Sequence, residues 1–281
     1  GLMKYFYVIS NLSKDYVLDV QDEVQSCLEK RGAVCRYMTD YERMKNGRHT
    51  PGEYVPEDTQ CIITIGGDGT LIQAARDLAG RNIPMLGINR GHLGFLNQVD
   101  RTEDIDAAMD ALVNERFRLE HRMMLRGTVF HEGKPVFQDI ALNEIIATSA
   151  EHLRVLRYDL AVNDEYLNEY AADGVMVATP TGSTAYNLSA GGPVMAPAGR
   201  MMAVTPVCSH TLNARSIVIS EEDRVKIGLL GKGLVTFDGD TSQKTGPGDY
   251  LIVERSHMET VMVKLKQISF MQNLSNYLGN V

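Results

Sequence analysis

Several features that define common protein classes are scarce or absent in this sequence. The 281 residues include only four cysteines (Cys27, Cys35, Cys61 and Cys208) and no C-x-x-C pair, which favours reduced thiols in a cytosolic protein over a disulfide framework. The seven histidines show no ligand spacing such as H-E-x-x-H, so no structural zinc site is expected. No apolar run approaches the roughly 20 residues that a membrane span requires, and the N-terminus has no secretory apolar segment. We therefore expect a cytoplasmic protein without a membrane partner.

The sequence also lacks an excess of positive charge. It has 28 lysines and arginines against 36 aspartates and glutamates, which gives a net charge of -8. This balance argues against a nucleic-acid partner bound through bulk positive charge. Hydrophobic residues make up 44% and charged residues 23%, as in a packed protein of about two domains. Any polyphosphate must then be held by local geometry, such as backbone amides and helix ends.

The first part of the chain alternates between strand and helix patterns. Buried strands are expected at 5–9, 33–38, 61–65 and 83–88. Helices are expected from a Ser13 cap to Gly32, over 71–78, and after Thr102. Residues 39–60 are polar and carry several glycines and prolines, which predicts a loop. Strands that alternate with crossover helices predict a parallel sheet covered on both faces, here an α/β domain over residues 1–118.

The remainder of the chain has a β-rich pattern. Short strands separated by turn signals predict an antiparallel, largely all-β domain over residues 119–267. The expected strands are 127–130, 140–146, 155–162, 174–178, 216–219, 225–230, 235–237, 251–253 and 261–265. The final segment 268–281 is amphipathic, and a helix there could complete the first domain.

A glycine cluster, Gly66-Gly67-Asp68-Gly69-Thr70, separates an expected strand from an expected helix. Such a turn at the edge of a parallel sheet offers its backbone amides to an anion. It contains no Walker lysine, and Ile72 stands where a dinucleotide fingerprint has its third glycine. The Asp68 carboxylate would repel an anion unless it binds a metal ion or accepts a hydrogen bond from a substrate hydroxyl. The alternative is that Asp68 merely caps the helix.

Two polar stretches in the β-rich half point to a ligand. Residues 179–186 (Thr-Pro-Thr-Gly-Ser-Thr-Ala-Tyr) combine hydroxyls, free amides and an aromatic ring, which suits a ribose and a purine, although an ordinary turn is the alternative. Asn143-Glu144 interrupts an apolar strand, so the two side chains would point to opposite faces and at least one would be buried. A strand end with both residues solvated is the alternative there.

These motifs together resemble the NAD kinase family. The family order is kept by residues 66–70, 143–144 and 179–186, and by Gly87-Ile88-Asn89-x-Gly91-x-Leu93-Gly94-Phe95-Leu96 and Ser189-Ala190-Gly191-Gly192-Pro193. The resemblance runs from about Tyr5 to the C-terminus. It implies a Rossmann-like N-terminal α/β domain, a β-sandwich-like C-terminal domain, an active site in the crevice between them, and a homodimer or homotetramer.

The reaction implied by the resemblance moves the γ-phosphoryl group of ATP, or a phosphoryl group of polyphosphate, to the 2′-hydroxyl of the adenosine ribose of NAD. Asp68 would accept the proton of that hydroxyl, the loop amides, including that of Gly69, would cradle the phosphates, and Mg²⁺ or another divalent cation would accompany ATP. No set of protein side chains is assigned to a metal. The implied NAD contacts are Asn143 and Glu144 for the adenosine, Thr184 and Ala185 for the adenine, Tyr186 at the ribose, Asp173 at the far end of the dinucleotide and Phe95 beside the adenine. Weaker alignments add Arg154, Thr181, Ser189 and Asp240.

Three positions depart from the family pattern. Ser209 replaces a proline, no proline follows Arg215, and Asp240 stands where glutamine is common, so a hydrogen-bond donor is lost there. Two other functions are weighed against the kinase. A lipid kinase of the diacylglycerol or sphingosine type shares the glycine-Asp loop but needs an apolar acceptor pocket, and a non-catalytic NAD-sensing module would keep the fold alone. The sequence leaves open the choice between ATP and polyphosphate, and the tolerance of NADH.

Overall fold

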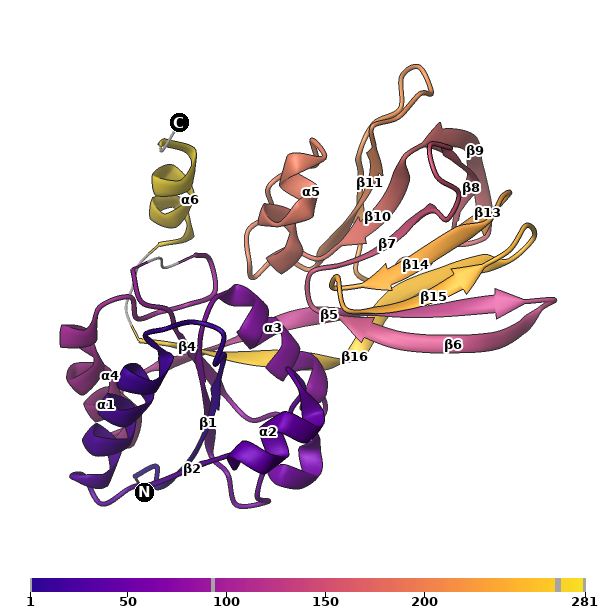
Figure 1. The fold of residues 1–281 in the computed structure, drawn as a ribbon. Coiled ribbons are helices and arrows are strands. Elements are labelled where there is room, and N and C mark those ends of the chain that lie inside the picture. The colour runs from indigo at the N-terminus through magenta and orange to yellow at the C-terminus, as the bar shows by residue number, and fades with distance from the viewer. Residues whose placement is uncertain (1, 92–93, 266–268, 280–281) are drawn as a thin grey trace. The chain divides into compact units, whose positions relative to one another are not determined.

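The computed structural model describes residues 2–91, 94–265 and 269–279, and the chain folds into two compact units (Figure 1). Unit 1 is formed by Gly1–His121 with Thr260–Val281, and unit 2 by Arg122–Glu259. Leu93 of the predicted glycine motif lies outside the described residues, as do residues 1, 266–268 and 280–281 of the predicted domains and C-terminal helix.

Unit 1 contains the predicted parallel sheet. Its strands are β1 (Tyr5–Ser10), β2 (Val34–Tyr37), β3 (Cys61–Ile65) and β4 (Met85–Ile88). They pair in the order β2-β1-β3-β4, and all these pairs are parallel. The last part of the long strand β16 (Tyr250–Lys264) extends the sheet beyond β4, with Met262 opposite Met85. The prediction of an N-terminal α/β fold is therefore confirmed.

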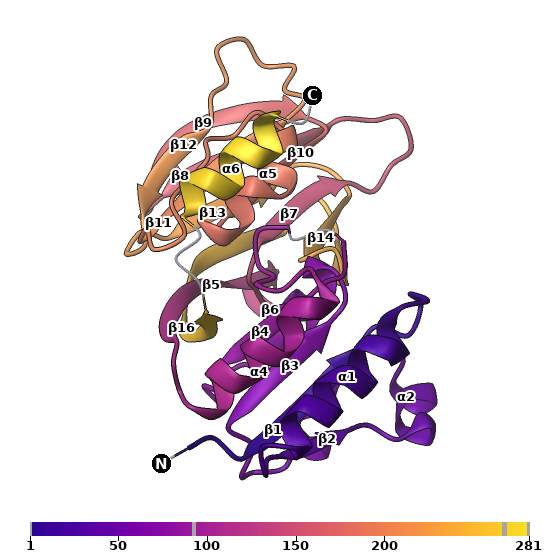
Figure 2. The same cartoon turned by 90° about the vertical axis from the view of Figure 1, so that its left-hand side faces the viewer.

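Helices cover both faces of this sheet. The helices of unit 1 are α1 (Val17–Glu29), α2 (Asp40–Asn46), α3 (Asp68–Asp77), α4 (Ile105–Val113) and α6 (Phe270–Gly279), with short 3-10 turns η1 (Gly52–Tyr54) and η2 (Thr102–Asp104), and neither α2 nor α6 has a buried residue. Figures 1 and 2 show α1 and α4 side by side on one face, and Figure 1 shows α3 on the other. The apolar residues of α1 and α4 join those of β1 and β3 in one buried core. Within the described ranges, every helix falls short of the length and apolar character needed to span a membrane.

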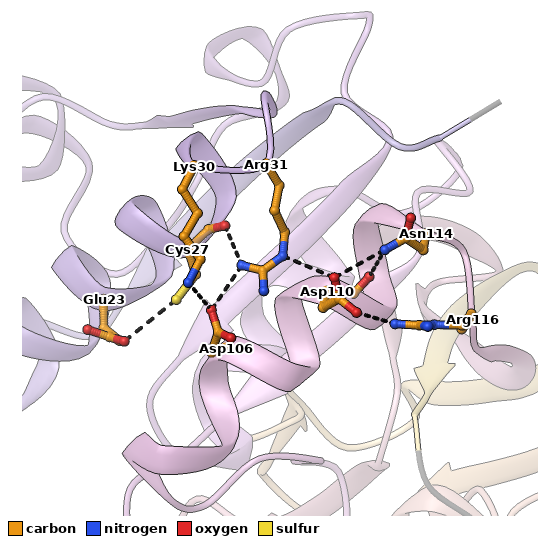
Figure 3. A network of polar contacts seen from close by, with 8 residues as sticks. All are labelled: Glu23, Cys27, Lys30, Arg31, Asp106, Asp110, Asn114 and Arg116. Carbon is orange, nitrogen blue, oxygen red and sulfur yellow. Dashed lines mark hydrogen bonds and ion pairs between the residues drawn. The ribbon is translucent and has the colours of Figure 1, made fainter.

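A polar network at the surface links α1 to α4 (Figure 3). Arg31 donates from Nη1 to Oδ1 of Asp106 at 3.0 Å and from Nε to Oδ1 of Asp110 at 3.2 Å. Lys30 adds an ion pair with Asp106, and Arg116 adds one with Asp110. The hydrogen bond from Arg31 lowers the pKa of Asp106 well below its usual range. Because these groups are partly exposed, the network orients the helices more than it stabilises them.

Two sequence predictions in unit 1 are wrong. Helix α1 begins at Val17 behind Tyr16 and has no side-chain cap, because the hydroxyl of Ser13 bonds to Oδ1 of Asn11 instead. Part of the predicted loop 39–60 is the helix α2. The Thr39 side chain accepts from the backbone of Glu42 while the Glu42 carboxylate accepts from the backbone of Thr39. This capping box satisfies the first backbone amides of a short polar helix, which apolar periodicity does not reveal.

Unit 2 is built from antiparallel strands, as predicted. Its strands are β5 (Arg118–His131), β6 (Lys134–Ala141), β7 (Glu144–Ser149), β8 (Leu156–Val162), β9 (Glu165–Ala172), β10 (Gly174–Ala178), β11 (Met201–Val207), β12 (Ile217–Ser220), β13 (Val225–Leu229), β14 (Gly233–Phe237), β15 (Thr241–Thr245) and the first part of β16. One sheet has the order β12-β11-β10-β7-β14-β15. In the other sheet, β13 pairs with β16 and β8, β8 with β9, and β5 with β6. Inward-facing residues of both sheets form one core, as in a sandwich.

The strand boundaries in unit 2 differ from the predictions at several points. The predicted strand 140–146 is broken, since β6 ends at Ala141 and β7 begins at Glu144. The predicted strands 251–253 and 261–265 belong to the single strand β16. Three strands were not predicted at all, and β6 was predicted only at its last two residues. Strand β9 is exposed over residues 165–169, and β15 consists of polar residues, so neither has an apolar pattern that indicates a strand. Strand β11 contains Pro206, a residue that argues against a strand when only the sequence is known.

Candidate functional site

The glycine loop of unit 1 joins the buried strand β3 to helix α3. Gly66 has a φ of +150°, and its N–H donates to the carbonyl of Ile88 at 2.9 Å. A Cβ at this position would lie 2.5 Å from Oγ1 of Thr70 and 3.0 Å from the Cβ of Asn11. Both the backbone angle and the close packing therefore require glycine at position 66.

The next two glycines of the loop are not required by the fold. Gly67 has a φ of -72°, which any residue adopts, and the atom nearest to a Cβ placed there would be Nζ of Lys14 at 3.8 Å. A Cβ at Gly69 would meet nothing within 4 Å. Side chains at these positions would fill open space beside the first turn of α3. Glycine leaves that space free for a ligand to approach the backbone amides.

The Asp68 carboxylate is held through both of its oxygens. Oδ1 accepts a hydrogen bond from Nδ2 of Asn97 at 2.7 Å, and Oδ2 accepts one from the N–H of Phe95 at 3.2 Å. Gly94 has a φ of +66°, and a Cβ there would lie 2.9 Å from both oxygens. Helix α3 takes Gly67 as its N-cap and has no side-chain capping bond, so the alternative that Asp68 caps the helix is wrong. The segment 94–97 instead orients the carboxylate.

Asn97 was missed by sequence reasoning. Its side chain is 1% exposed, and Oδ1 is buried with no hydrogen-bond partner among the described residues. A Cβ at Gly87 would lie 2.3 Å from that Oδ1, so the glycine of β4 makes room for the amide. The available signal was a polar residue directly after the apolar Phe95 and Leu96. The buried side-chain amide of Asn97 therefore forms a hydrogen bond that fixes the position of the Asp68 carboxylate.

Phe95 connects this segment to the C-terminal helix. Its ring centroid lies 6.3 Å from that of Phe270 and 5.4 Å from that of Tyr277, both on α6. The ring of Phe95 is tilted relative to each of these two rings, an arrangement that aromatic pairs favour. The backbone of Phe95 therefore bonds to Asp68 while its ring contacts α6.

In unit 2, Asp238 organises the Asn143-Glu144 pair. Its carboxylate accepts hydrogen bonds from the N–H groups of Leu142 (2.6 Å), Asn143 (2.7 Å) and Glu144 (3.0 Å). This turn separates β6 from β7, so Asn143 and Glu144 do not alternate within one strand as predicted. Asp238 has a φ of +51° and precedes Gly239 in the β14–β15 turn. The sequence D-G signals a hairpin turn, but nothing in it indicates that the aspartate bonds to another segment.

Glu144 is the buried member of the pair, which agrees with the prediction that at least one of the two is buried. Its exposed fraction is 9%. Burial, and then the nearby Asp238 carboxylate, raise the pKa of Glu144 to about 7, while a hydrogen bond from the backbone N–H of Tyr186 opposes this shift. Glu144 therefore changes protonation near neutral pH.

The predicted hydroxyl-rich segment packs directly on this pair. The N–H of Thr179 donates to the carbonyl of Asn143 at 3.0 Å, and a Cβ at Gly182 would lie 2.0 Å from the same oxygen. The segment continues as the 3-10 turn η3 (Thr181–Thr184) and the short helix α5 (Tyr186–Ser189). Oγ1 of the buried Thr181 accepts a hydrogen bond from Nη1 of Arg122 at 3.1 Å.

The hydroxyl-rich segment also presents groups to solvent. Thr184 and Ala185 are half-buried, Ser189 is exposed, and the ring of Tyr186 is 46% exposed. Unit 2 thus brings together the predicted residues Asn143, Glu144 and Tyr186, with Thr184 and Ala185 beside them in the chain. Their exposed and half-buried groups adjoin one buried carboxylate.

Arg154 and Asp173 contact residues other than the Asn143-Glu144 pair, and Asp240 lies in the β14–β15 turn that also carries Asp238. Arg154 is exposed and pairs with Glu151 at 3.2 Å. Asp173 is exposed, with Oδ1 3.9 Å from Nε2 of His210. The N–H of Asp240 donates to the carbonyl of Phe237 within the hairpin turn. Their assignment to a ligand still rests on the resemblance.

Comparison with known proteins agrees with the motifs. The ATP-NAD kinase N-terminal domain family matches residues 12–117, and the ATP-NAD kinase C-terminal domain family matches residues 142–265. A protein of Lachnospira eligens named NAD kinase is 36% identical over 98% of this chain and 99% of its own. Another of that name from Agathobacter rectalis is 37% identical over 99% of each chain.

Two solved structures share the fold. Yeast NADH kinase complexed with NADH has a TM-score of 0.87 at 21% identity, covering 100% of this chain and 88% of its own. An NAD kinase from Archaeoglobus fulgidus in complex with ATP has a TM-score of 0.76 at 22% identity, and the match covers 98% of this chain and 97% of that protein's chain. The structural likeness supports the two-part fold, and the full-length sequence identity goes further: this chain belongs to the ATP-NAD kinase family.

Proposed function

We propose that this protein is an NAD kinase, which transfers the γ-phosphoryl group of ATP, or a phosphoryl group of polyphosphate, to the 2′-hydroxyl of the adenosine ribose of NAD and so makes NADP. Membership of the ATP-NAD kinase family over nearly the whole chain supports this function. The observation that carries the chemistry is the Asp68 carboxylate, fixed through both oxygens between two glycines that the fold does not need.

Asp68 is the catalytic residue in this proposal. A sugar hydroxyl is far too weak an acid to be ionised at neutral pH, so a carboxylate must orient it and take its proton as the new bond to phosphorus forms. Phosphoryl transfer otherwise needs positioning and stabilisation of charge on the transferred group. The backbone amides of Gly67 and Gly69 are the groups of this loop that would face the phosphates.

The Asn143-Glu144 turn and the segment 181–186 are assigned to NAD. A carboxyl group that changes protonation near pH 7 can accept or donate a hydrogen bond to a ribose hydroxyl or to adenine nitrogens. The hydroxyl of Thr184 and the half-exposed ring of Tyr186 supply further polar and flat surface for a nucleoside. Phe95, Arg154, Asp173, Ser189 and Asp240 are proposed as further NAD contacts from the family resemblance.

The divalent cation is proposed to enter with the phosphoryl donor. Among the described residues, no group of three or more His, Cys, Asp or Glu is placed to hold a metal ion. Mg²⁺ commonly binds through one or two carboxylates, water and substrate phosphates, so Asp68 beside a phosphate chain fits that ion. Bound there, Mg²⁺ would neutralise phosphate charge and offset the repulsion between the donor and Asp68.

The lipid kinase alternative gains no support from the comparisons, since both matched families are ATP-NAD kinases. A cytoplasmic location, a homodimer or homotetramer, and the choice of donor stay predictions.

The deciding experiment supplies the purified protein with MgATP and one acceptor at a time: NAD, a diacylglycerol or sphingosine. We expect NADP from NAD, detected through its reduction by an NADP-specific dehydrogenase, which also identifies the 2′ position. Replacing ATP with polyphosphate in the same assay identifies the preferred donor. Phosphorylated lipid, or no NADP with either donor, would contradict the proposal.

A further inference from the structure

The loop between β1 and α1, residues 11–16, lies against the glycine loop of unit 1. The N–H of Asn11 donates to the carbonyl of Ile65 at 2.9 Å, at the end of β3. A Cβ on Gly66 would lie 3.0 Å from the Cβ of Asn11. Hydrogen bonds from the N–H and hydroxyl of Ser13 to Oδ1 of Asn11 hold the loop compact. The two loops therefore form one structured edge of the sheet.

This edge is the point where the chain connections diverge. Strand β1 lies between β2 and β3, and all three strands are parallel. The chain that leaves β1 crosses through α1 to β2 on one side, whereas the chain that leaves β3 crosses through α3 to β4 on the other. In open parallel sheets, ligands bind at the carboxyl ends of strands where such connections part. Lys14 lies at that point.

The ammonium of Lys14 faces the part of the glycine loop that the fold leaves open. Its Nζ lies 3.8 Å from the position that a Cβ on Gly67 would take. The side chain is half-buried, and within the described ranges it forms no hydrogen bond or ion pair. Among the described residues this partly desolvated cation has no counterion, and it lies next to the open space beside Gly67, an arrangement that is complementary to an anionic ligand.

We propose that Lys14 is a phosphate-binding residue whose Nζ donates to an oxygen of the phosphoryl donor's phosphate chain at Gly67. The β1–α1 loop would thereby supply the lysine that the glycine loop itself lacks. This assignment rests on the proposed kinase function. The phosphates belong to the donor and not to the dinucleotide, because the transferred group must reach the hydroxyl held by Asp68, one residue from Gly67.

The test measures steady-state kinetics of NADP formation for Lys14→Gln and Lys14→Arg. Removing a charged hydrogen bond to phosphate should raise the KM for ATP about 10- to 100-fold in Lys14→Gln and leave the KM for NAD unchanged. Lys14→Arg keeps the charge, so its KM for ATP should lie much closer to that of the wild type. Inorganic tripolyphosphate should compete with ATP as an inhibitor, and its inhibition constant should rise in parallel with the KM for ATP. The matched control is Lys45→Gln on the exposed side of α2, which should change neither constant.

Three results would overturn the assignment of Lys14. An unchanged KM for ATP, or a change confined to the KM for NAD, would show that the donor does not contact this side chain. Equal constants for the Gln and Arg variants would show that the charge is irrelevant. If Lys14→Gln folds poorly, a KM for ATP in Lys14→Arg that is raised as far as predicted for the Gln variant would overturn the assignment. All three results presuppose a wild-type enzyme that makes NADP. A wild-type protein that makes none would overturn the proposed function instead.

Discussion

The two candidate carboxylates of this protein, Asp68 in unit 1 and Glu144 in unit 2, have opposite environments. Asp68 is half-buried, and its two oxygens accept hydrogen bonds from N–H donors of the segment 94–97. Glu144 is buried beside a second carboxylate, Asp238, which itself accepts three backbone N–H groups. One environment stabilises negative charge, and the other opposes it.

This difference fits the roles proposed for the two residues, Asp68 as the base and Glu144 as a group that binds NAD. A group that takes a proton during the reaction has to be ionised beforehand, and donors on both oxygens also fix its direction. A group that recognises a nucleoside needs hydrogen-bonding capacity, which a neutral carboxyl retains. Removing or altering each carboxylate should therefore affect different measurements.

The largest effect is expected for Asp68→Asn. The amide keeps the size of the side chain but cannot take the proton, so kcat for NADP formation should fall about 10²- to 10⁴-fold. NAD binding, measured by calorimetry, should persist because the proposed NAD contacts lie mostly in unit 2. Asp19→Asn, a change at an exposed acid on α1, is the matched control and should leave kcat unaltered. Near wild-type turnover in the Asp68 variant would assign the base to another group.

Sequence reasoning named Asp68 and Phe95 but not Asn97, the second residue that orients the carboxylate, and not Lys14. The glycine loop can be recognised in the sequence because it lies between an expected buried strand and an expected helix, and the structure shows both elements. Asn97 and Lys14 approach Asp68 and Gly67 from other connections, so no local pattern near residues 66–70 contains them. They become visible only when the order β2-β1-β3-β4 places these loops at one edge.

The same limit applies to the fold as a whole. Buried strands such as β3 and β10 were predicted with their observed bounds, because uninterrupted apolar runs indicate them directly. The boundary between β6 and β7 was missed because it depends on Asp238, almost a hundred residues later in the chain. Helix α2 was missed because a capping box, and not an apolar stripe, stabilises it.

The next largest effect concerns stability, in the variant Glu144→Gln. Between the usual pKa of 4.5 and the raised pKa of about 7, the folded protein keeps the Glu144 proton while the unfolded chain releases it. The contribution of Glu144 to the free energy of unfolding of the wild type therefore falls as the pH rises through this window, and it stays at the lower value above the window. Glutamine resembles the protonated form and can still donate to Asp238, so it removes that loss.

The measurement for Glu144→Gln is the free energy of unfolding by denaturant at pH 4 and pH 8. The free energy of unfolding of the variant, minus that of the wild type, should be about 3 kcal/mol larger at pH 8 than at pH 4. The exposed Glu165→Gln serves as the control and should give the same difference at both pH values. A pH-independent difference for Glu144→Gln would show that this carboxyl is ionised throughout.

A smaller loss of activity is expected for Asn97→Ala. The variant removes the 2.7 Å hydrogen bond to Oδ1 of Asp68 but leaves the bond from the N–H of Phe95. A carboxylate released on one side should lower kcat about 10- to 100-fold. KM for NAD should change little, which separates this positioning role from ligand binding. Asn97→Asp would place two carboxylates in contact and should be worse than alanine, whereas equal values would indicate that only packing matters.

The smallest effect is expected where Phe95 contacts the C-terminal helix. In Phe95→Leu the backbone N–H that bonds to Asp68 is kept, while the ring contacts with Phe270 and Tyr277 are lost, at a cost of about 1 kcal/mol. Because α6 has no buried residue, this loss should appear as faster amide hydrogen exchange in residues 270–279. Phe130→Leu, which removes a stacked ring pair with Tyr250 in unit 2, is the control and should leave that exchange unchanged. If Phe95→Leu left α6 equally protected, its attachment to unit 1 would have to depend on contacts other than these rings.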